Sequence, residues 1–280
     1  MPEELQIRVH GEAALPTLVY LPGLHGDWTL IGSFRQAVEG RARFVEFTYP
    51  RTTEWTLRDY ADAVERALTA HGITNGWLLG ESYGSQVAWA ILGRDELRES
   101  DFCPAGDGQS GTRIARPSGR FQPSGLILAG GFVTYPGKWR VRLTARFMRR
   151  AGQAQIRWFL GVYARYARFR HRHAPETLAG VAEFVSRRTE ADRQAMLRRL
   201  RLIEGNDATA IASQATLPVF QLAGAFDPVV PAFAVRRWLR AHCPGYRVTR
   251  IVFPADHNVL STEPCQSAEQ VLQWMQTTPH

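Results

Sequence analysis

One pentapeptide constrains the fold of this chain more than any other segment. Residues 80–84 read Gly-Glu-Ser-Tyr-Gly, a G-x-S-x-G pattern. The apolar run 77–79 precedes the pattern directly, and a largely apolar segment, 85–92, follows it. The two glycines allow a tight turn in which side chains at their positions would clash. The arrangement therefore predicts a strand, a sharp turn and a helix, with the Ser82 hydroxyl presented at the turn.

The predicted turn also places Ser82 at the start of a helix. A helix N-terminus offers backbone N–H groups without intrahelical partners and a partial positive charge, which suits a developing oxyanion. A bare G-x-S-x-G pattern is common, and an ordinary strand-to-helix turn is the alternative interpretation. The position between a buried strand and a helix makes Ser82 a candidate nucleophile.

Length and composition fit one globular α/β domain. The chain has 280 residues, of which 45% are hydrophobic and 21% charged, and this composition excludes extensive disorder. No window of about 18 residues is continuously apolar, so no membrane span is expected. The N-terminal residues are acidic and do not have the profile of a signal peptide, so a cytoplasmic location is expected. Cys103, Cys243 and Cys265 have no C-x-x-C spacing, so neither a disulfide framework nor a zinc site is predicted.

Strand patterns alternate with helical patterns along most of the chain. The alternation predicts an α/β fold with a mainly parallel central sheet flanked by helices. The expected strands are 5–10, 17–21, 42–48, 77–80, 125–129, 219–223 and 247–253. The expected helices are 57–71, 83–92, 232–242 and 264–276.

Two segments break this alternation. Residues 94–124 are polar and rich in Gly, Pro and Ser, which predicts a long surface loop. Residues 135–205 have a helical pattern throughout and carry 17 Lys and Arg against 5 Asp and Glu, whereas the whole chain has a net charge of +8. We interpret 135–205 as a helical cap, or lid, inserted into a core of residues 1–134 and 206–280. The chain has no nucleic-acid-binding motif, so the basic excess is interpreted as a solvated helix face.

A serine nucleophile needs a base, and the base needs an orienting carboxylate. The carboxyl ends of parallel strands meet at one edge of the sheet, so both groups should follow later strands. Asp227 follows the predicted strand 219–223, and His257 follows the predicted strand 247–253. Asp256 is the competing choice for the carboxylate, although adjacent side chains in a loop rarely face each other.

The oxyanion hole needs two backbone N–H donors. Tyr83, which follows the nucleophile, would supply one of them. The second should come from the loop after strand 17–21, where Leu24 is the preferred donor because it lies close to the strand end. Asp27 is the alternative if His25-Gly26 rather than Pro22-Gly23 sets the register.

Together these motifs resemble the α/β-hydrolase superfamily over roughly residues 15–275. The order Ser82, Asp227, His257 is the order of that family's triad. The resemblance implies an α/β-hydrolase fold with a helical lid, and a reaction that requires neither metal nor organic cofactor. The sequence departs from the family pattern where Pro22-Gly23 replaces the usual His-Gly, and where Asp256 replaces the glycine usual before the histidine.

The resulting prediction is a serine hydrolase that cleaves a small-molecule carboxylic ester or thioester through an acyl-enzyme. An acyltransferase, a lactonase or a C–C bond hydrolase would use the same triad. A non-catalytic ligand receptor on the same fold is a further alternative. The acyl chain, the leaving group and the oligomeric state are left open by the sequence.

Overall fold

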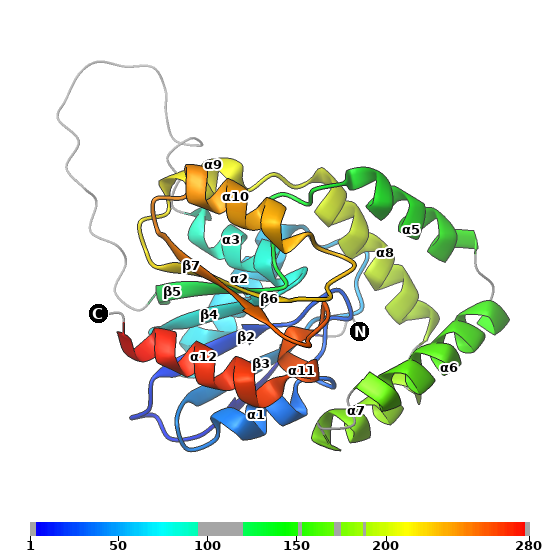
Figure 1. Cartoon of the computed structure of the whole chain (residues 1–280), viewed down its shortest axis with the longest axis horizontal. Helices are drawn as coiled ribbons and strands as arrows, with labels where there is room; N and C mark the ends of the chain where they lie inside the picture. The colour runs from blue at the N-terminus through cyan, green and yellow to red at the C-terminus, as the bar shows by residue number, and fades with distance from the viewer. Residues whose placement is uncertain (1–3, 95–119, 151–152, 171–174, 187–188, 278–280) are drawn as a thin grey trace, which may run out of the picture.

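The strands form one twisted sheet at the centre of the molecule (Figure 1). The computed structural model describes residues 4–94, 120–150, 153–170, 175–186 and 189–277. Within these residues the sheet has seven strands in the order β1-β3-β2-β4-β5-β6-β7. Only β1 runs antiparallel to its neighbour, and every other described pair is parallel. The strands are β1 (Gln6–His10), β2 (Thr17–Leu21), β3 (Arg43–Thr48), β4 (Asn75–Glu81), β5 (Gln122–Ala129), β6 (Val219–Gly224) and β7 (Tyr246–Val252).

Helices cover both faces of the sheet, which confirms the predicted α/β class (Figure 1). One face carries α2 (Leu57–Ala70), α3 (Gly84–Leu92), α9 (Thr209–Gln214) and α10 (Ala232–His242). The other face carries α1 (Gly32–Val38), α11 (Val259–Thr262) and α12 (Pro264–Thr277). The strand β2 shows why both layers are needed. Val19 and Leu21 pack into one core, and Leu18 and Tyr20 pack into the other.

The predicted elements lie close to the observed ones, with two main differences. The short helices α1, α9 and α11 were not predicted, because a helix of one or two turns offers too few positions for a clear period. β5 begins at Gln122 instead of Gly125, so the end of the predicted loop 94–124 is wrong. Gln122 pairs with Asn75 of β4, and backbone pairing of this kind leaves no hydrophobic pattern. Residues 95–119 of that predicted loop lie outside the described residues.

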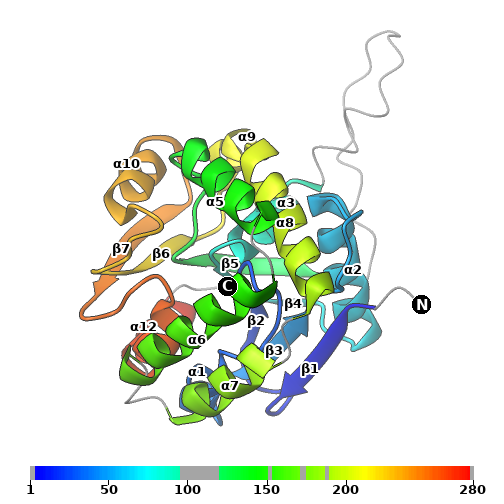
Figure 2. The same ribbon diagram turned by 90° about the vertical axis from the view of Figure 1, so that its right-hand side faces the viewer.

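Four helices are described within the predicted cap, residues 135–205. They are α5 (Lys138–Arg150), α6 (Gln153–Arg170), α7 (Pro175–Ser186) and α8 (Glu190–Gly205). These helices face the viewer in Figure 2. α5 packs against α8, and α6 packs against α7. The second pair touches the core where α7 packs against α1. The helices that the structure describes include none long and apolar enough to cross a membrane.

Candidate active site

Ser82 occupies a sharp turn between β4 and α3. Its φ angle is 50°, and it is the one non-glycine residue with a positive φ among the described residues. Such a conformation is strained for a residue with a side chain. Two hydrogen bonds hold the turn: the N–H of Ser82 donates to the carbonyl of Ala129 at 3.0 Å, and the Ser85 hydroxyl donates to the carbonyl of Ser82 at 2.6 Å. The strain is therefore stabilised by β5 on one side and by α3 on the other.

The two glycines of the pentapeptide are required by close backbone approaches. A Cβ at Gly80 would lie 2.7 Å from the Cα of Ser85. A Cβ at Gly84 would lie 2.0 Å from the carbonyl oxygen of Leu21. These are backbone atoms, which cannot move aside as a flexible side chain can. The contacts confirm the steric reason for the predicted turn.

We expect Gly84→Ala to disrupt this turn. The added methyl group must displace the end of β2, and overpacking of this kind costs about 3 kcal/mol in the free energy of unfolding. Chemical denaturation would measure the loss. Gly205→Ala is the matched control, because a Cβ at Gly205 meets nothing within 4 Å. A Gly84→Ala protein as stable as Gly205→Ala would contradict the steric argument.

The structure brings Ser82, His257 and Asp227 into one hydrogen-bonded chain. The Nε2 atom of His257 lies 2.9 Å from the Oγ of Ser82. Its Nδ1 atom lies 2.9 Å from the Oδ2 of Asp227. The three residues follow β4, β7 and β6, so they meet at the carboxyl edge of the sheet, as the order of motifs predicts.

Asp227 is held in place by its own loop. Its side chain is 2% exposed, and that of His257 is 16% exposed. The backbone N–H groups of Val229 and Val230 donate to Oδ1 of Asp227 at 2.7 and 2.9 Å. The second oxygen, Oδ2, is thereby directed at the imidazole. A carboxylate fixed in this way can orient the histidine and stabilise its protonated form.

Asp256 has different partners. Its Oδ1 accepts a hydrogen bond from the backbone N–H of Asn258 at 2.9 Å, and its Oδ2 accepts one from the Tyr166 hydroxyl of α6 at 3.1 Å. The geometry therefore favours Asp227 over Asp256 as the carboxylate partner of His257. The Tyr166 contact attaches α6 beside the histidine, and sequence reasoning did not identify it.

Two further glycines let the histidine loop approach the sheet. A Cβ at Gly130, where φ is 55°, would lie 2.8 Å from the carbonyl oxygen of His257. A Cβ at Gly224 would lie 2.1 Å from the carbonyl oxygen of Asp256. Sequence reasoning missed both positions. The available signal was a glycine at the carboxyl end of each of two neighbouring strands, β5 and β6.

The loop that contains Leu24 lies directly against the turn at Ser82. The N–H of Gly26 donates to the carbonyl of Gly23 at 3.0 Å, which makes residues 23–26 a tight turn. A Cβ at Gly23 would meet the carbonyl oxygen of Glu81 at 3.5 Å. Among the hydrogen bonds of the described residues, none uses the backbone N–H of Leu24 or Tyr83. The loop of Leu24 thus lies next to the turn of Ser82 and Tyr83, and the role of these two N–H groups as oxyanion donors stays a prediction.

The side chain of Tyr83 has a separate, structural place. Its ring packs edge-on against Tyr49 and Tyr60. Burial raises the pKa of the Tyr83 hydroxyl well above its ordinary value, so this hydroxyl stays neutral near neutral pH. Any contribution of Tyr83 to the chemistry therefore rests on its backbone N–H.

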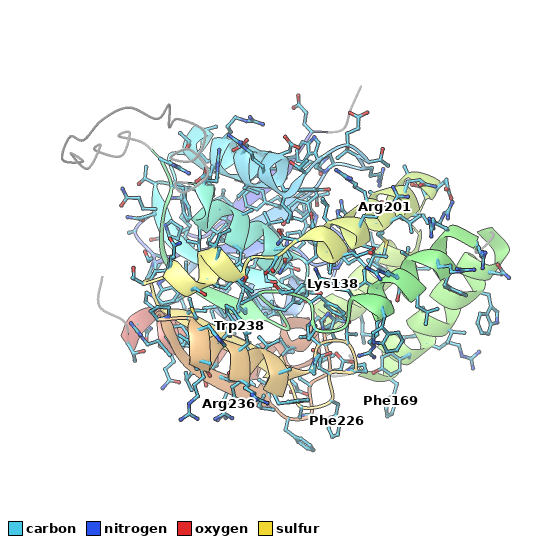
Figure 3. The ribbon with its side chains drawn as sticks, turned by 90° about the horizontal axis from the view of Figure 1, so that it is seen from above. Lys138, Phe169, Arg201, Phe226, Arg236 and Trp238 are labelled. Carbon is cyan, nitrogen blue, oxygen red and sulfur yellow. The ribbon has the colours of Figure 1, made fainter. Side chains whose placement is uncertain are left out.

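The cap segment attaches to the loop that carries Asp227. The Tyr135 hydroxyl donates to the carbonyl of Val229 at 2.9 Å, and the Arg140 guanidinium donates to the carbonyl of Pro228 at 2.9 Å. Phe226 in the same loop and Phe169 of α6 are both largely exposed (Figure 3). Exposed apolar side chains recur at helical spacing on α5 and α6, namely Trp139, Leu143, Phe147, Trp158, Val162, Tyr166 and Phe169.

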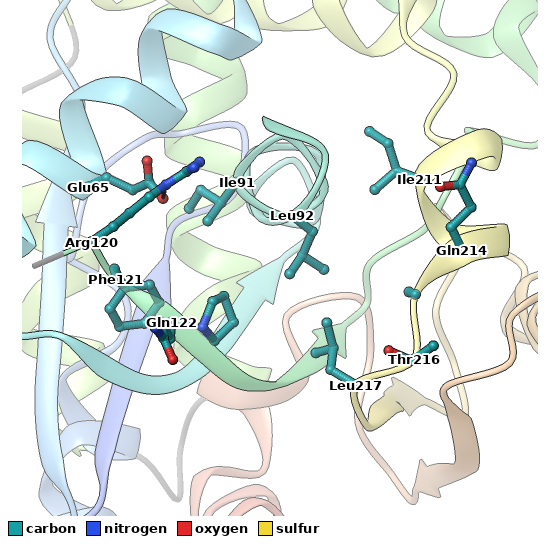
Figure 4. A pocket seen from close by; sticks show the side chains of 12 residues that line it. Glu65, Ile91, Leu92, Arg120, Phe121, Gln122, Ile211, Gln214, Thr216 and Leu217 are labelled. Carbon is teal, nitrogen blue, oxygen red and sulfur yellow. Dashed lines mark hydrogen bonds and ion pairs between the residues drawn. The ribbon is translucent and has the colours of Figure 1, made fainter. Parts of the chain in front are cut away.

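A separate cavity of about 380 Å³ lies at the amino ends of the strands, on the side of the sheet opposite the carboxyl edge (Figure 4). Its walls come from the middle of α2, the ends of α3 and α9, and the amino end of β5. Glu65 and Arg120 form an ion pair on one wall, with Nε and Oε1 3.3 Å apart. The cavity faces away from the carboxyl edge and includes none of the triad residues, so we do not assign it to the chemistry of Ser82.

Comparison with known proteins gives matches at the level of structure. Neither a family model nor a curated protein sequence matches this chain. A hydrolase from Pseudomonas aeruginosa PA01 superposes with a TM-score of 0.71 at 17% identity, covering 98% of this chain and 94% of that one. A thermophilic esterase from Thermogutta terrifontis gives 0.69 at 18%, covering 98% and 93%. The enol-lactonase from Burkholderia xenovorans LB400 gives 0.70 at 16%, covering 97% and 96%.

These likenesses extend over nearly the whole of each chain. The identities are too low to transfer an activity or a substrate. What they show is the fold. The fold of this chain is the α/β-hydrolase fold.

Proposed function

We propose that this chain is a serine hydrolase that cleaves carboxylic esters or thioesters through an acyl-enzyme. The observation that carries the proposal is the chain of contacts from Asp227 through His257 to Ser82, with both hydrogen bonds at 2.9 Å. A serine hydroxyl is a weak nucleophile by itself, and a base within hydrogen-bond reach activates it. The named activities of the esterase and enol-lactonase structures support the same class of chemistry.

The proposed reaction has two steps. His257 accepts the Ser82 proton on Nε2 while Oγ forms a bond to the carbonyl carbon. The backbone N–H groups of Tyr83 and Leu24 donate to the resulting oxyanion. The tetrahedral intermediate collapses, the bond to the leaving oxygen or sulfur breaks, and the leaving group takes the proton from His257. Water then attacks the acyl-enzyme by the same route and releases the carboxylic acid.

The exposed apolar side chains of the cap favour a substrate with a hydrophobic acyl group. Trp158, Val162, Tyr166 and Phe169 lie along one face of α6 at helical spacing. Tyr166 on that face contacts Asp256, the neighbour of His257, so this face is turned toward the proposed site. Trp158 is 71% exposed and Phe169 66% exposed. Apolar side chains left open beside a nucleophile are suited to cover an alkyl or aryl chain.

A reactive probe and a substrate series test the proposal. A fluorophosphonate should label Ser82, identified by mass spectrometry of the modified peptide. With p-nitrophenyl esters from acetate to decanoate, kcat/KM should rise beyond acetate, because each buried methylene contributes about 0.8 kcal/mol. Folded protein that takes up no probe and hydrolyses none of the esters, thioesters and lactones offered would contradict the proposal. It would favour a ligand receptor on this fold.

A further inference from the structure

Arg199 is a buried cation next to the loop of the proposed oxyanion hole. It lies on α8 and is 2% exposed. Its Nη1 donates to the carbonyls of Leu24 and His25 at 3.0 and 3.2 Å. Its Nη2 donates to the carbonyl of Pro50 at 3.3 Å. One guanidinium thus joins the cap segment to two consecutive peptide units of the oxyanion loop.

The partners of this cation are neutral groups. Among the described residues, no carboxylate oxygen lies within 4 Å of Arg199, and its Nε points to the Tyr60 hydroxyl at 3.4 Å. The guanidinium also lies over the rings of Tyr49 and Tyr60, 5.5 and 6.0 Å from their centroids. A buried charge is costly to desolvate. Losing the hydrogen bonds of a buried guanidinium therefore costs more free energy than losing those of an exposed arginine. The orientation of the loop therefore depends on this group.

Gly26 provides the space that the guanidinium occupies. A Cβ at Gly26, where φ is 79°, would lie 2.3 Å from Nη1 of Arg199. The carbonyl of Gly26 accepts a hydrogen bond from the Tyr49 N–H at 2.8 Å. Both sides of the loop are thus fixed, by Arg199 on one side and by the chain after β3 on the other.

We propose that Arg199 is a positioning residue for the oxyanion hole. By holding the Leu24 and His25 carbonyls, it fixes the peptide units next to the Leu24 N–H, which then points at the reacting carbonyl. The inference rests on the proposed function and adds a residue outside the triad, contributed by the cap.

The test compares Arg199→Met and Arg199→Lys with Arg198→Met. Arg198 is the matched control, because it lies on the same helix and holds only the carbonyls of Trp55 and Glu54, at 3.0 and 3.2 Å. Loss of one oxyanion donor costs about 10²–10³-fold in kcat. A misdirected donor should cost less, so we expect Arg199→Met to lower kcat by about 10–100-fold with KM little changed. Arg199→Lys should recover part of the loss, since a lysine keeps the charge but lacks the planar fork.

A second readout separates positioning from general stability. Binding of a boronic acid, which forms a tetrahedral adduct with the serine, should weaken in Arg199→Met by the same factor as kcat/KM. Arg198→Met should keep both values within about twofold. Assays run well below the melting temperature of each variant exclude partial unfolding as the cause.

Other results would overturn either the role of Arg199 or the proposed function. A folded Arg199→Met protein with wild-type kcat overturns the inference, as does a loss equal to that of Arg198→Met. If Arg199→Met does not fold, a folded Arg199→Lys protein with wild-type kcat and boronate affinity overturns it. Wild-type protein that is not labelled at Ser82 by a fluorophosphonate and hydrolyses none of the esters, thioesters and lactones rejects the proposed function itself. Labelling together with an unaffected Arg199→Met variant rejects only the role of Arg199.

Discussion

Ser82→Ala and His257→Ala should each lower kcat/KM toward the ester by about 10⁴–10⁶-fold. The expectation follows from the 2.9 Å contact between His257 Nε2 and Ser82 Oγ. Without the hydroxyl there is no atom to form the acyl-enzyme, and without the imidazole there is no base to accept its proton. Because the two groups act as one unit, the double variant should be hardly slower than either single variant.

Two substitutions elsewhere serve as controls for the loss of a serine or a histidine side chain. Ser213→Ala on α9 and His242→Ala on α10 change exposed positions away from the triad residues. Both should keep kcat/KM within about twofold. Ester turnover that survives in Ser82→Ala at more than a few per cent of the wild-type rate would place the nucleophile elsewhere. Strictly additive losses in the double variant would argue against a shared step.

Local pattern was sufficient for the turn at Ser82 and for most of the sheet. The glycines around Ser82 and the apolar run of β4 are neighbours in sequence, so their combination can be read without any tertiary information. The positions of Asp227 and His257 also followed from local pattern, because each lies in the loop after a strand and the carboxyl ends of parallel strands share an edge. The strand order and the antiparallel pairing of β1 were not predicted, since pairing partners leave little trace in either sequence.

The parts that escaped sequence reasoning depend on contacts between distant segments. Arg199 is one of 17 Lys and Arg residues between positions 135 and 205, and its sequence neighbours do not distinguish it from the exposed ones. Its burial is decided by Leu24, Pro50 and Tyr60, which lie far away in the chain. Gly130 and Gly224 are likewise required by the backbone of the loop that carries His257. The role assigned to the whole cap, a lid over the site, stays a prediction.

Three residues of the cap share one feature. Tyr166, Arg199 and Tyr135 each extend from the segment 135–205 and bind a loop that carries a proposed catalytic group. The cap is therefore attached to the loops of His257, of Leu24 and of Asp227 by separate hydrogen bonds. Substitution of any of these three residues should consequently change the rate of the reaction as well as the choice of substrate.

Asp227→Asn should lower kcat by about 10⁴-fold while KM stays nearly unchanged. The Val229 and Val230 N–H groups hold one carboxylate oxygen of Asp227, so the new amide NH₂ would face Nδ1 of His257. A donor at that place favours the tautomer with its proton on Nε2, which directs an N–H at Ser82 where a lone pair is needed. Steady-state kinetics with the same ester would measure the loss. Asp256→Asn is the matched control, because the adjacent carboxylate binds Asn258 and Tyr166 instead of the imidazole. If Asp256→Asn lowered kcat as far as Asp227→Asn, the orienting role would not belong to Asp227, and the 2.9 Å contact would have to be explained by packing of the loop alone.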